Sequence, residues 1–140
     1  MKKIIIIFAV ALMMSAASCS DPNMHKNSDG SFTIVTTELC KDIRGYNGRV
    51  PAEVTIKDGV IQDVKILENK ETPSYLERVE REMLPKFRGI NLSEISSIDA
   101  VSGATFTSRA LRKNVETAAE YYEERKWFKR LSSRKNKILW

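Results

Sequence analysis

The residues best suited to chemistry lie in one short stretch, Asp99 to Ser108, which reads DAVSGATFTS. Seven of its positions hold four hydroxyl groups and two very small residues, namely Ser102, Gly103, Ala104, Thr105, Thr107 and Ser108. Gly103 can adopt a positive φ, and beside Ala104 it leaves the backbone open to close approach by a bulky group. This composition suits a loop that binds a ligand through hydroxyl and backbone groups.

A helix is expected directly after this loop. Apolar residues follow at spacings of four, three and four, at Leu111, Val115, Ala118 and Tyr122. We therefore predict a helix that begins near Thr107 and runs past Tyr122, with Thr107 or Ser108 as its cap. The free N–H groups and positive dipole end of such a helix suit an anion such as a phosphate. An ordinary loop with a Ser or Thr cap would show the same pattern.

The same stretch resembles a motif of a known family. Ser102-Gly103-Ala104-Thr105, with Asp99 before it and Thr107-Ser108 after it, is similar to the flavinylation motif of the FMN-binding domain family. That family includes the flavin-bearing C subunit of the sodium-translocating NADH:quinone oxidoreductase and the G subunit of the related electron-transport complex. Further segments resemble family segments in the same order, at residues 45–48, 53–64 and 68–73. The resemblance covers residues 45 to 120.

The resemblance implies a role for each residue of the site. FMN would be joined through its phosphate to the hydroxyl of Thr105, in a loop shaped by Ser102, Gly103 and Ala104. Thr107 and Ser108 would steady the phosphate, and Asp99 would help a separate flavin transferase to recognise the site. Glu71 and Thr72 would lie near the isoalloxazine ring, and Tyr46 would stack on it or flank it. Asp99 as a turn former and Tyr46 as a core residue are the alternatives.

The N-terminus resembles a bacterial lipoprotein signal. Met1-Lys2-Lys3 is positively charged, Ile4 to Met14 is an apolar run too short to span a bilayer comfortably, and small residues precede Cys19. Ala16 stands where a Leu is more usual, so a conventional signal peptide cleaved near Ser18 or Ser20 is the alternative. Either signal sends the domain out of the cytoplasm, into a bacterial cell envelope.

The chain divides into four expected parts. Residues 1–18 form the signal, residues 19–30 a flexible tether lipidated at Cys19, residues 31–124 the domain and residues 125–140 a basic aromatic tail. With 140 residues and 42% hydrophobic content there is room for one small domain. Once Cys19 carries lipid, Cys40 is the remaining thiol, which excludes an internal disulfide. The single His, His25, and the absence of His or Cys clusters disfavour a metal site or a Cys–His catalyst.

Alternating patterns predict an antiparallel sheet. Strands are expected at residues 32–37, 49–56 and 60–67, and Asp58-Gly59 is a strong hairpin signal between the last two. Thr72-Pro73-Ser74 should open a helix, with Ser74 and Glu77 fitting a capping box, and Pro85 should end or kink it. The expected fold is α+β: a small antiparallel sheet packed against two helices, with the flavinylation loop before the C-terminal helix.

The charge of the chain is concentrated at its C-terminal end. Residues 125–137 hold seven Lys or Arg and no acid, whereas residues 20–124 hold 14 basic and 18 acidic residues, a net charge of −4. Trp127, Phe128 and Leu131 lie among these basic residues. For an exported domain this pattern favours a membrane surface or a partner protein over nucleic acid. A solvated helix end is the alternative.

The sequence thus predicts an exported, membrane-anchored electron-transfer module with covalent FMN. The resemblance implies that it is the substrate of a separate, magnesium-dependent flavin transferase that uses FAD, and that it need not be an enzyme itself. Its partners would be redox donor and acceptor proteins or a quinone-linked complex. An FMN-holding sensory domain or an envelope interaction module is the alternative function.

Overall fold

A four-stranded antiparallel sheet forms one layer of the protein. The structure is a computed structural model that describes residues 20–138, with side chains to residue 135. The strands are β1 (Met24–Lys26), β2 (Phe32–Val35), β3 (Ala52–Lys57) and β4 (Val60–Ile66), and they lie side by side in chain order. The predicted α+β class is confirmed. The predicted signal (1–18) and Cys19 lie outside the described residues.

The β3–β4 hairpin forms where the sequence predicts it. Asp58 has φ 52° and Gly59 has φ 78°, the two positive values that a two-residue type I′ turn requires. Ala52, Val54 and Ile56 of β3 are fully buried on one face, whereas Glu53, Thr55 and Lys57 are only partly covered on the other. One face of the sheet therefore belongs to the core.

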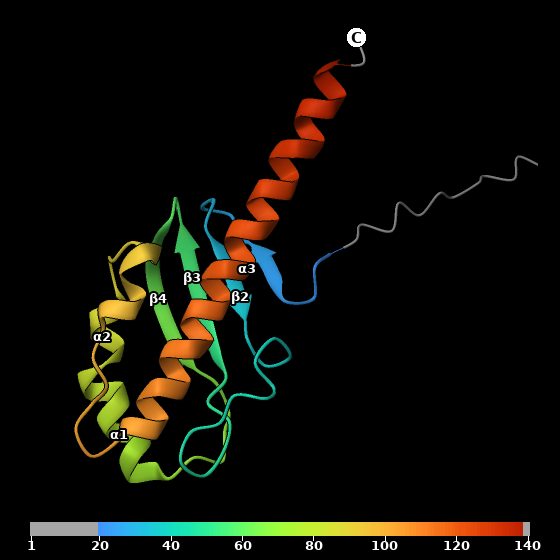
Figure 1. The fold of residues 1–140 in the computed structure, drawn as a ribbon. Coiled ribbons are helices and arrows are strands. Elements are labelled where there is room, and N and C mark those ends of the chain that lie inside the picture. Colours follow the sequence, from blue (N-terminus) through green and yellow to red (C-terminus); the bar gives the residue numbers. More distant parts are fainter. Residues whose placement is uncertain (1–19, 139–140) are drawn as a thin grey trace, which may run out of the picture.

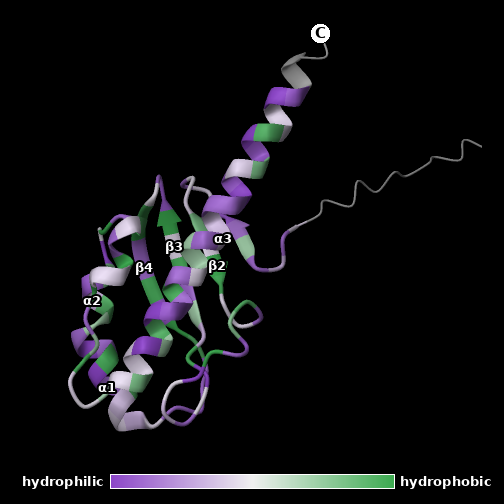
Figure 2. Ribbon diagram, in the orientation of Figure 1, coloured by the Kyte–Doolittle hydropathy of each residue, from purple (hydrophilic) through white to green (hydrophobic). Residues whose placement is uncertain are grey.

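Helix α3 (Thr105–Ile138) crosses the buried face of the sheet and projects well beyond its edge (Figure 1). The predicted apolar positions Leu111, Val115, Ala118 and Tyr122 are all buried, and they face the core formed by the strands. The projecting part is mostly hydrophilic, with short hydrophobic segments (Figure 2). In the described residues no helix is both long and apolar enough to cross a membrane.

Two short helices and a 3₁₀ turn complete the second layer. Helix α1 (Pro73–Glu82) is followed by α2 (Leu84–Phe87) and by η1 (Leu92–Ser97). The predicted apolar side of α1 is confirmed, because Val79 and the following Met83 are fully buried. The predicted capping box of Ser74 and Glu77 is wrong: α1 begins at Pro73, whose fixed φ suits a first helical position, so Thr72 takes the cap position.

The segment 20–30, expected as a flexible tether, contributes structure to the domain. Its residues 24–26 form β1, which pairs with residues 32–34 of β2. Asp21 accepts hydrogen bonds from Tyr121 Oη at 2.7 and 2.8 Å and forms an ion pair with Arg125 at 3.0 Å. The structure differs from the expectation because the pairing of β1 with β2 and the Asp21 carboxylate hold this polar segment in place beside α3. Neither contact can be predicted from the composition of the segment.

A buried polar network joins the sheet to α3. Thr36 Oγ1 donates to Asn114 Oδ1 at 2.5 Å and accepts from the Ala52 amide at 2.9 Å. Asn114 Nδ2 in turn donates to the Ala110 carbonyl at 2.8 Å. Thr36 and Asn114 are fully buried, so these bonds also satisfy groups that have no access to water.

We predict that Thr36→Val destabilises the domain by about 1–3 kcal/mol, because the Ala52 amide and Asn114 Oδ1 are left buried without partners. Thr55→Val makes the same change on the outer face of the sheet and should cost less than about 0.5 kcal/mol. Urea unfolding of both variants measures the difference. Equal costs would show that the network contributes nothing specific.

A second prediction concerns acid stability. Burial raises the pKa of the Asp21 carboxyl, but the hydrogen bonds from Tyr121 and the Asn23 amide, with the charge of Arg125, lower it below its ordinary value of 3.8. Since this folded-state pKa is lowered, the ionised group stabilises the fold above pH 3.8, and the contribution is lost as the pH falls through the lowered pKa. Asp21→Asn should therefore be less stable than wild type near neutral pH, and the difference should narrow on acidification.

Urea unfolding over a pH series measures that difference, with Asp42→Asn as the control for an exposed carboxylate. A gap that stays constant from neutral to acid pH would contradict the role assigned to Asp21.

Candidate functional site

Thr105 is the first residue of α3 and its side chain is exposed. A turn precedes it, closed by a hydrogen bond from the Ala104 amide to the Val101 carbonyl at 3.0 Å. Gly103 lies in this turn with φ 79°, as predicted for a position that favours glycine. The helix starts two residues earlier than predicted, because the first helical bond runs from the Ser108 amide to the Ala104 carbonyl. The prediction that Thr107 or Ser108 caps the helix is therefore wrong.

Thr107 and Ser108 lie inside the first turn and are fully buried. Ser108 Oγ donates to the Ala104 carbonyl at 2.7 Å and accepts from the Val101 amide at 3.0 Å. This hydroxyl holds the turn before Thr105 against the helix. Thr107 Oγ1 has no hydrogen-bond partner among the described residues. A contact of either hydroxyl with a phosphate stays a prediction.

An open cavity of about 250 Å³ lies at the start of α3. Three aromatic residues and the loop line it, namely Tyr46, Tyr75, Gly103, Ala104, Thr105, Phe106 and Thr107. The Tyr46 ring lies 5.0 Å from that of Tyr75 and 6.4 Å from that of Phe106, measured between centroids. Tyr46 and Phe106 are each 62% exposed. Exposed aromatic faces beside a hydroxyl at a helix N-terminus fit a ligand that has a flat ring and a phosphate.

Glu71 holds in place the loop of residues 45–48, which contains Tyr46. This carboxylate is buried, and its Oε1 accepts hydrogen bonds from the amides of Asn47 and Thr72, each at 2.9 Å. Its Oε2 has no partner among the described residues and lies against Gly45. Glu71 thus joins the 45–48 loop to the start of α1, and Thr72 occupies the cap position of that helix.

Three residues near Thr105 were missed by the sequence analysis: Tyr75, Phe106 and Arg78. Arg78 Nη1 donates to the Ser102 carbonyl at 3.3 Å, and a β-carbon at Gly103 would lie 2.6 Å from the same nitrogen. A guanidinium therefore adds positive charge at the open end of α3. Phe106 follows Thr105 directly, which is a signal that sequence analysis could have used. Tyr75 and Arg78 share a face of α1, but only tertiary packing brings that face to the loop.

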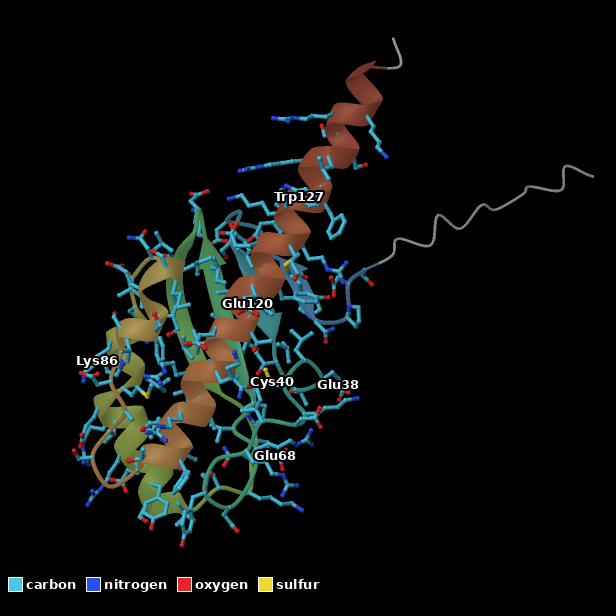
Figure 3. The ribbon with its side chains drawn as sticks, in the orientation of Figure 1. Glu38, Cys40, Glu68, Lys86, Glu120 and Trp127 are labelled. Atoms are coloured by element: carbon cyan, nitrogen blue, oxygen red, sulfur yellow. The ribbon has the colours of Figure 1, made fainter. Side chains whose placement is uncertain are left out.

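The remaining predicted site residues lie at the edge of this arrangement. Ser102 is exposed and contributes its carbonyl to Arg78, and the exposed Asp99 lies outside the residues that line the cavity. Cys40 is buried beside α3 (Figure 3), and this burial raises the pKa of its thiol. The prediction that Cys40 is a small buried residue is confirmed.

A larger cavity of about 570 Å³ opens next to the same loop. Most of the residues that line it are polar or charged, among them Arg44, Asn47, Arg49, Glu68 and Lys70; Figure 3 labels Glu68. Aromatic side chains are absent from the lining, and Thr105 does not reach it. The smaller cavity is the candidate site, because it alone of the two combines the aromatic rings with the first turn of α3.

We predict that Gly45→Ala disturbs the site more than Gly48→Ala does. A β-carbon at residue 45 would collide with Glu71 Oε2 and lie 3.2 Å from the Thr107 backbone, whereas at residue 48 the nearest atom is 3.4 Å away. Moving the Glu71 carboxylate breaks its two amide hydrogen bonds and should cost about 1–3 kcal/mol. Urea unfolding and flavin loading of both variants provide the measurement. Equal behaviour of the two variants would show that the loop accommodates the added methyl group.

Comparison with known proteins identifies the family of the chain. The model of the FMN-binding domain matches residues 45–120, just over half of the chain, and these residues contain every side chain that lines the candidate cavity. A curated relative is the G subunit of the ion-translocating oxidoreductase complex of Shewanella piezotolerans (strain WP3 / JCM 13877), 29% identical over 116 residues. The match covers 72% of this chain and 53% of the relative, so the chain spans about half the length of that protein. No solved structure matches the chain significantly. The extent of the family match shows that the chain belongs to the FMN-binding domain family.

Proposed function

We propose that this protein is an electron-transfer module of a bacterial cell envelope, with FMN joined to Thr105 by a phosphoester. The observation that carries the proposal is the exposed hydroxyl of Thr105 at the first residue of α3, inside an aromatic cavity of an FMN-binding domain. The similarity to a subunit of an ion-translocating oxidoreductase complex supports electron transfer over mere storage of flavin.

Each part of the cavity has a role in this proposal. The first backbone amides of α3 have no carbonyl partner within the helix, so they can donate to a phosphate on Thr105. Arg78, which lies against Ser102 and Gly103, adds a positive charge beside them. Tyr46, Tyr75 and Phe106 provide flat apolar surfaces for the isoalloxazine ring. Bound FMN supplies one- and two-electron transfer, and the chain supplies position and electrostatics.

Attachment would require a separate flavin transferase. Joining Thr105 Oγ1 to the FMN half of FAD forms one oxygen–phosphorus bond, breaks the pyrophosphate bond and releases AMP. The hydroxyl proton must pass to a base of the transferase, because the side chains around Thr105 are aromatic, small or cationic. Thr105 is exposed, so a second protein can reach it without unfolding the domain. The domain is then the substrate of that enzyme, and Asp99 lies close enough in sequence to be recognised with it.

Export and anchoring belong to the same proposal. The basic start, short apolar run and small residues before Cys19 favour acylation of Cys19 in the envelope. A covalent flavin suits this location, since a flavin held by contacts alone would be lost by diffusion outside the cell. The redox donor and acceptor would be envelope proteins or a quinone-linked complex.

We predict that Thr105→Ala abolishes covalent flavin while the domain stays folded, because an exposed hydroxyl and methyl group are lost from the surface. Thr117→Ala makes the same change farther along α3, away from the cavity, and should keep the flavin. Intact mass and in-gel flavin fluorescence after denaturation, for protein made with the transferase and an export signal, measure the linkage. Fluorescence that survives denaturation in Thr105→Ala would disprove attachment at this residue.

Redox titration and reoxidation rates of the loaded protein then separate an electron carrier from a sensory domain. A carrier must be reduced and reoxidised at rates useful to a partner, whereas a flavin that stays in one oxidation state under the same conditions would favour the alternative.

A further inference from the structure

The projecting part of α3 carries an apolar stripe that nothing in the described structure covers. Trp127 and Phe128 are 57% and 59% exposed, Leu131 is 37% exposed, and the Trp127 and Phe128 rings contact each other edge to face at 5.3 Å. At about 100° per residue these three side chains fall within about 100° of one another around the helix. Figure 3 shows Trp127 beyond the end of the sheet.

This stripe is not a continuation of the face that packs on the sheet. Ala118 and Tyr122 belong to the core, and their face lies roughly 150° around the helix from the centre of the stripe. The helix therefore presents one apolar face to its own domain and, farther along, an opposite one to its surroundings. Because α3 is one continuous helix, the second face cannot turn toward the core of the domain.

Basic side chains flank the stripe. Arg130, Arg134 and Lys135 fall between or beside the three apolar residues on the helix surface, and all three are exposed. Residues 125–137 contain no acid, whereas Glu123 and Glu124 end an acidic segment directly before them. Along α3 the sign of the charge thus changes at residue 125, so within this helix the attraction to an anionic surface is concentrated in the tail.

The N-terminal end of the domain lies at the base of the same tail. Asp21 is held by Tyr121 and by Arg125, so the described chain begins beside the point where α3 leaves the sheet. Cys19, the proposed lipid site, is two residues before Asp21 in the sequence. A lipid at Cys19 would therefore enter a membrane close to the basic aromatic tail.

We propose that residues 125–135 bind the surface of an anionic phospholipid membrane, with Trp127, Phe128 and Leu131 in the interface and Arg130, Arg134 and Lys135 at the headgroups. Aromatic and aliphatic side chains between long basic ones are typical of interfacial helices, in which the basic stems extend their charges toward the headgroups. The proposal rests on the proposed location in the envelope, but not on flavin attachment.

Membrane binding by the tail orients the flavin site. Thr105 lies about 33 Å from Trp127 along the helix axis, at 1.5 Å per residue. Because α3 is continuous, the tail holds the cavity of Thr105 at a fixed end of a rigid arm, away from the lipid contact. A second contact beside the lipid anchor restricts the directions in which the flavin can face and shortens its search for a partner.

The test uses flavin-free protein comprising residues 20–140, since every contact described above lies within residues 20–138. Co-sedimentation is measured with phosphatidylglycerol-containing vesicles and with phosphatidylcholine vesicles, at low and at high salt. Fluorescence of Trp127 is followed in a Trp140→Phe background, and circular dichroism checks folding. We expect binding to the anionic vesicles alone, a blue shift of Trp127 and release at high salt.

Two tail variants separate the apolar and basic contributions. The triple variant Trp127→Ser, Phe128→Ser, Leu131→Ser keeps the charge, and Arg130→Gln, Arg134→Gln, Lys135→Gln keeps the stripe. Each should weaken binding to anionic vesicles by at least about tenfold. The control Lys41→Gln, Lys65→Gln, Lys86→Gln removes the same charge from exposed positions of the domain and should bind within about twofold of wild type.

The proposal is overturned if wild type does not bind the vesicles, if either tail variant binds as wild type does, or if the control loses as much as the basic variant. Binding of the tail to an acidic protein, with no vesicle binding, would also overturn it. Flavin loading of the same variants is measured separately, so a failure of the tail proposal stays distinct from a failure of attachment at Thr105.

Discussion

The packing of α3 across the sheet is the contact on which the rest of the structure depends. Leu111, Val115, Ala118 and Tyr122 bury one side of the helix against the strands, and the Thr36–Asn114 network fixes its position along the sheet. Apolar burial drives this docking, while the buried hydrogen bonds restrict it to one register, because a shifted helix would leave polar groups unpaired. Both ends of α3 are positioned by this one interface.

At the N-terminal end, docking brings together segments that are distant in the chain. The aromatic cavity combines Tyr46 from the 45–48 loop, Tyr75 from α1 and Phe106 from α3. Glu71 connects that loop to the start of α1 through its two amide hydrogen bonds. Ser108 ties the turn before Thr105 to the helix that the core holds. The exposed Thr105 hydroxyl is thus presented on an ordered turn at the surface, as its proposed modification by a second protein requires.

At the C-terminal end, the same helix continues where the sheet no longer covers it. Asp21 joins the start of the described chain to this region through Tyr121 and Arg125. The docking of α3 on the sheet therefore holds the proposed flavin site and the proposed membrane contact at opposite ends of the helix. The arrangement places the proposed cofactor site and the proposed orienting surface at the two ends of one helix.

The sequence by itself determined those features that depend on neighbouring residues. The Asp58-Gly59 turn, the alternation of β3 and the apolar side of α3 follow from local sterics and periodicity, and the structure confirms them. The loop around Thr105 was identified from four hydroxyls and two small residues, and the family was recognised from that motif.

Only the tertiary structure decided which distant side chains surround Thr105 and where α3 begins. Arg78 and Tyr75 reach the loop because α1 packs beside α3. Gly103 allows the chain to turn before Thr105, so α3 begins two residues earlier than expected. The Ser108 hydroxyl is therefore buried, where it bonds to the Ala104 carbonyl. The polar segment 20–30 joined the domain through strand pairing and the contacts of Asp21, which span about a hundred residues of sequence. Contacts over such separations leave no periodic trace in the sequence, because each depends on the packing of elements that the intervening chain must first form.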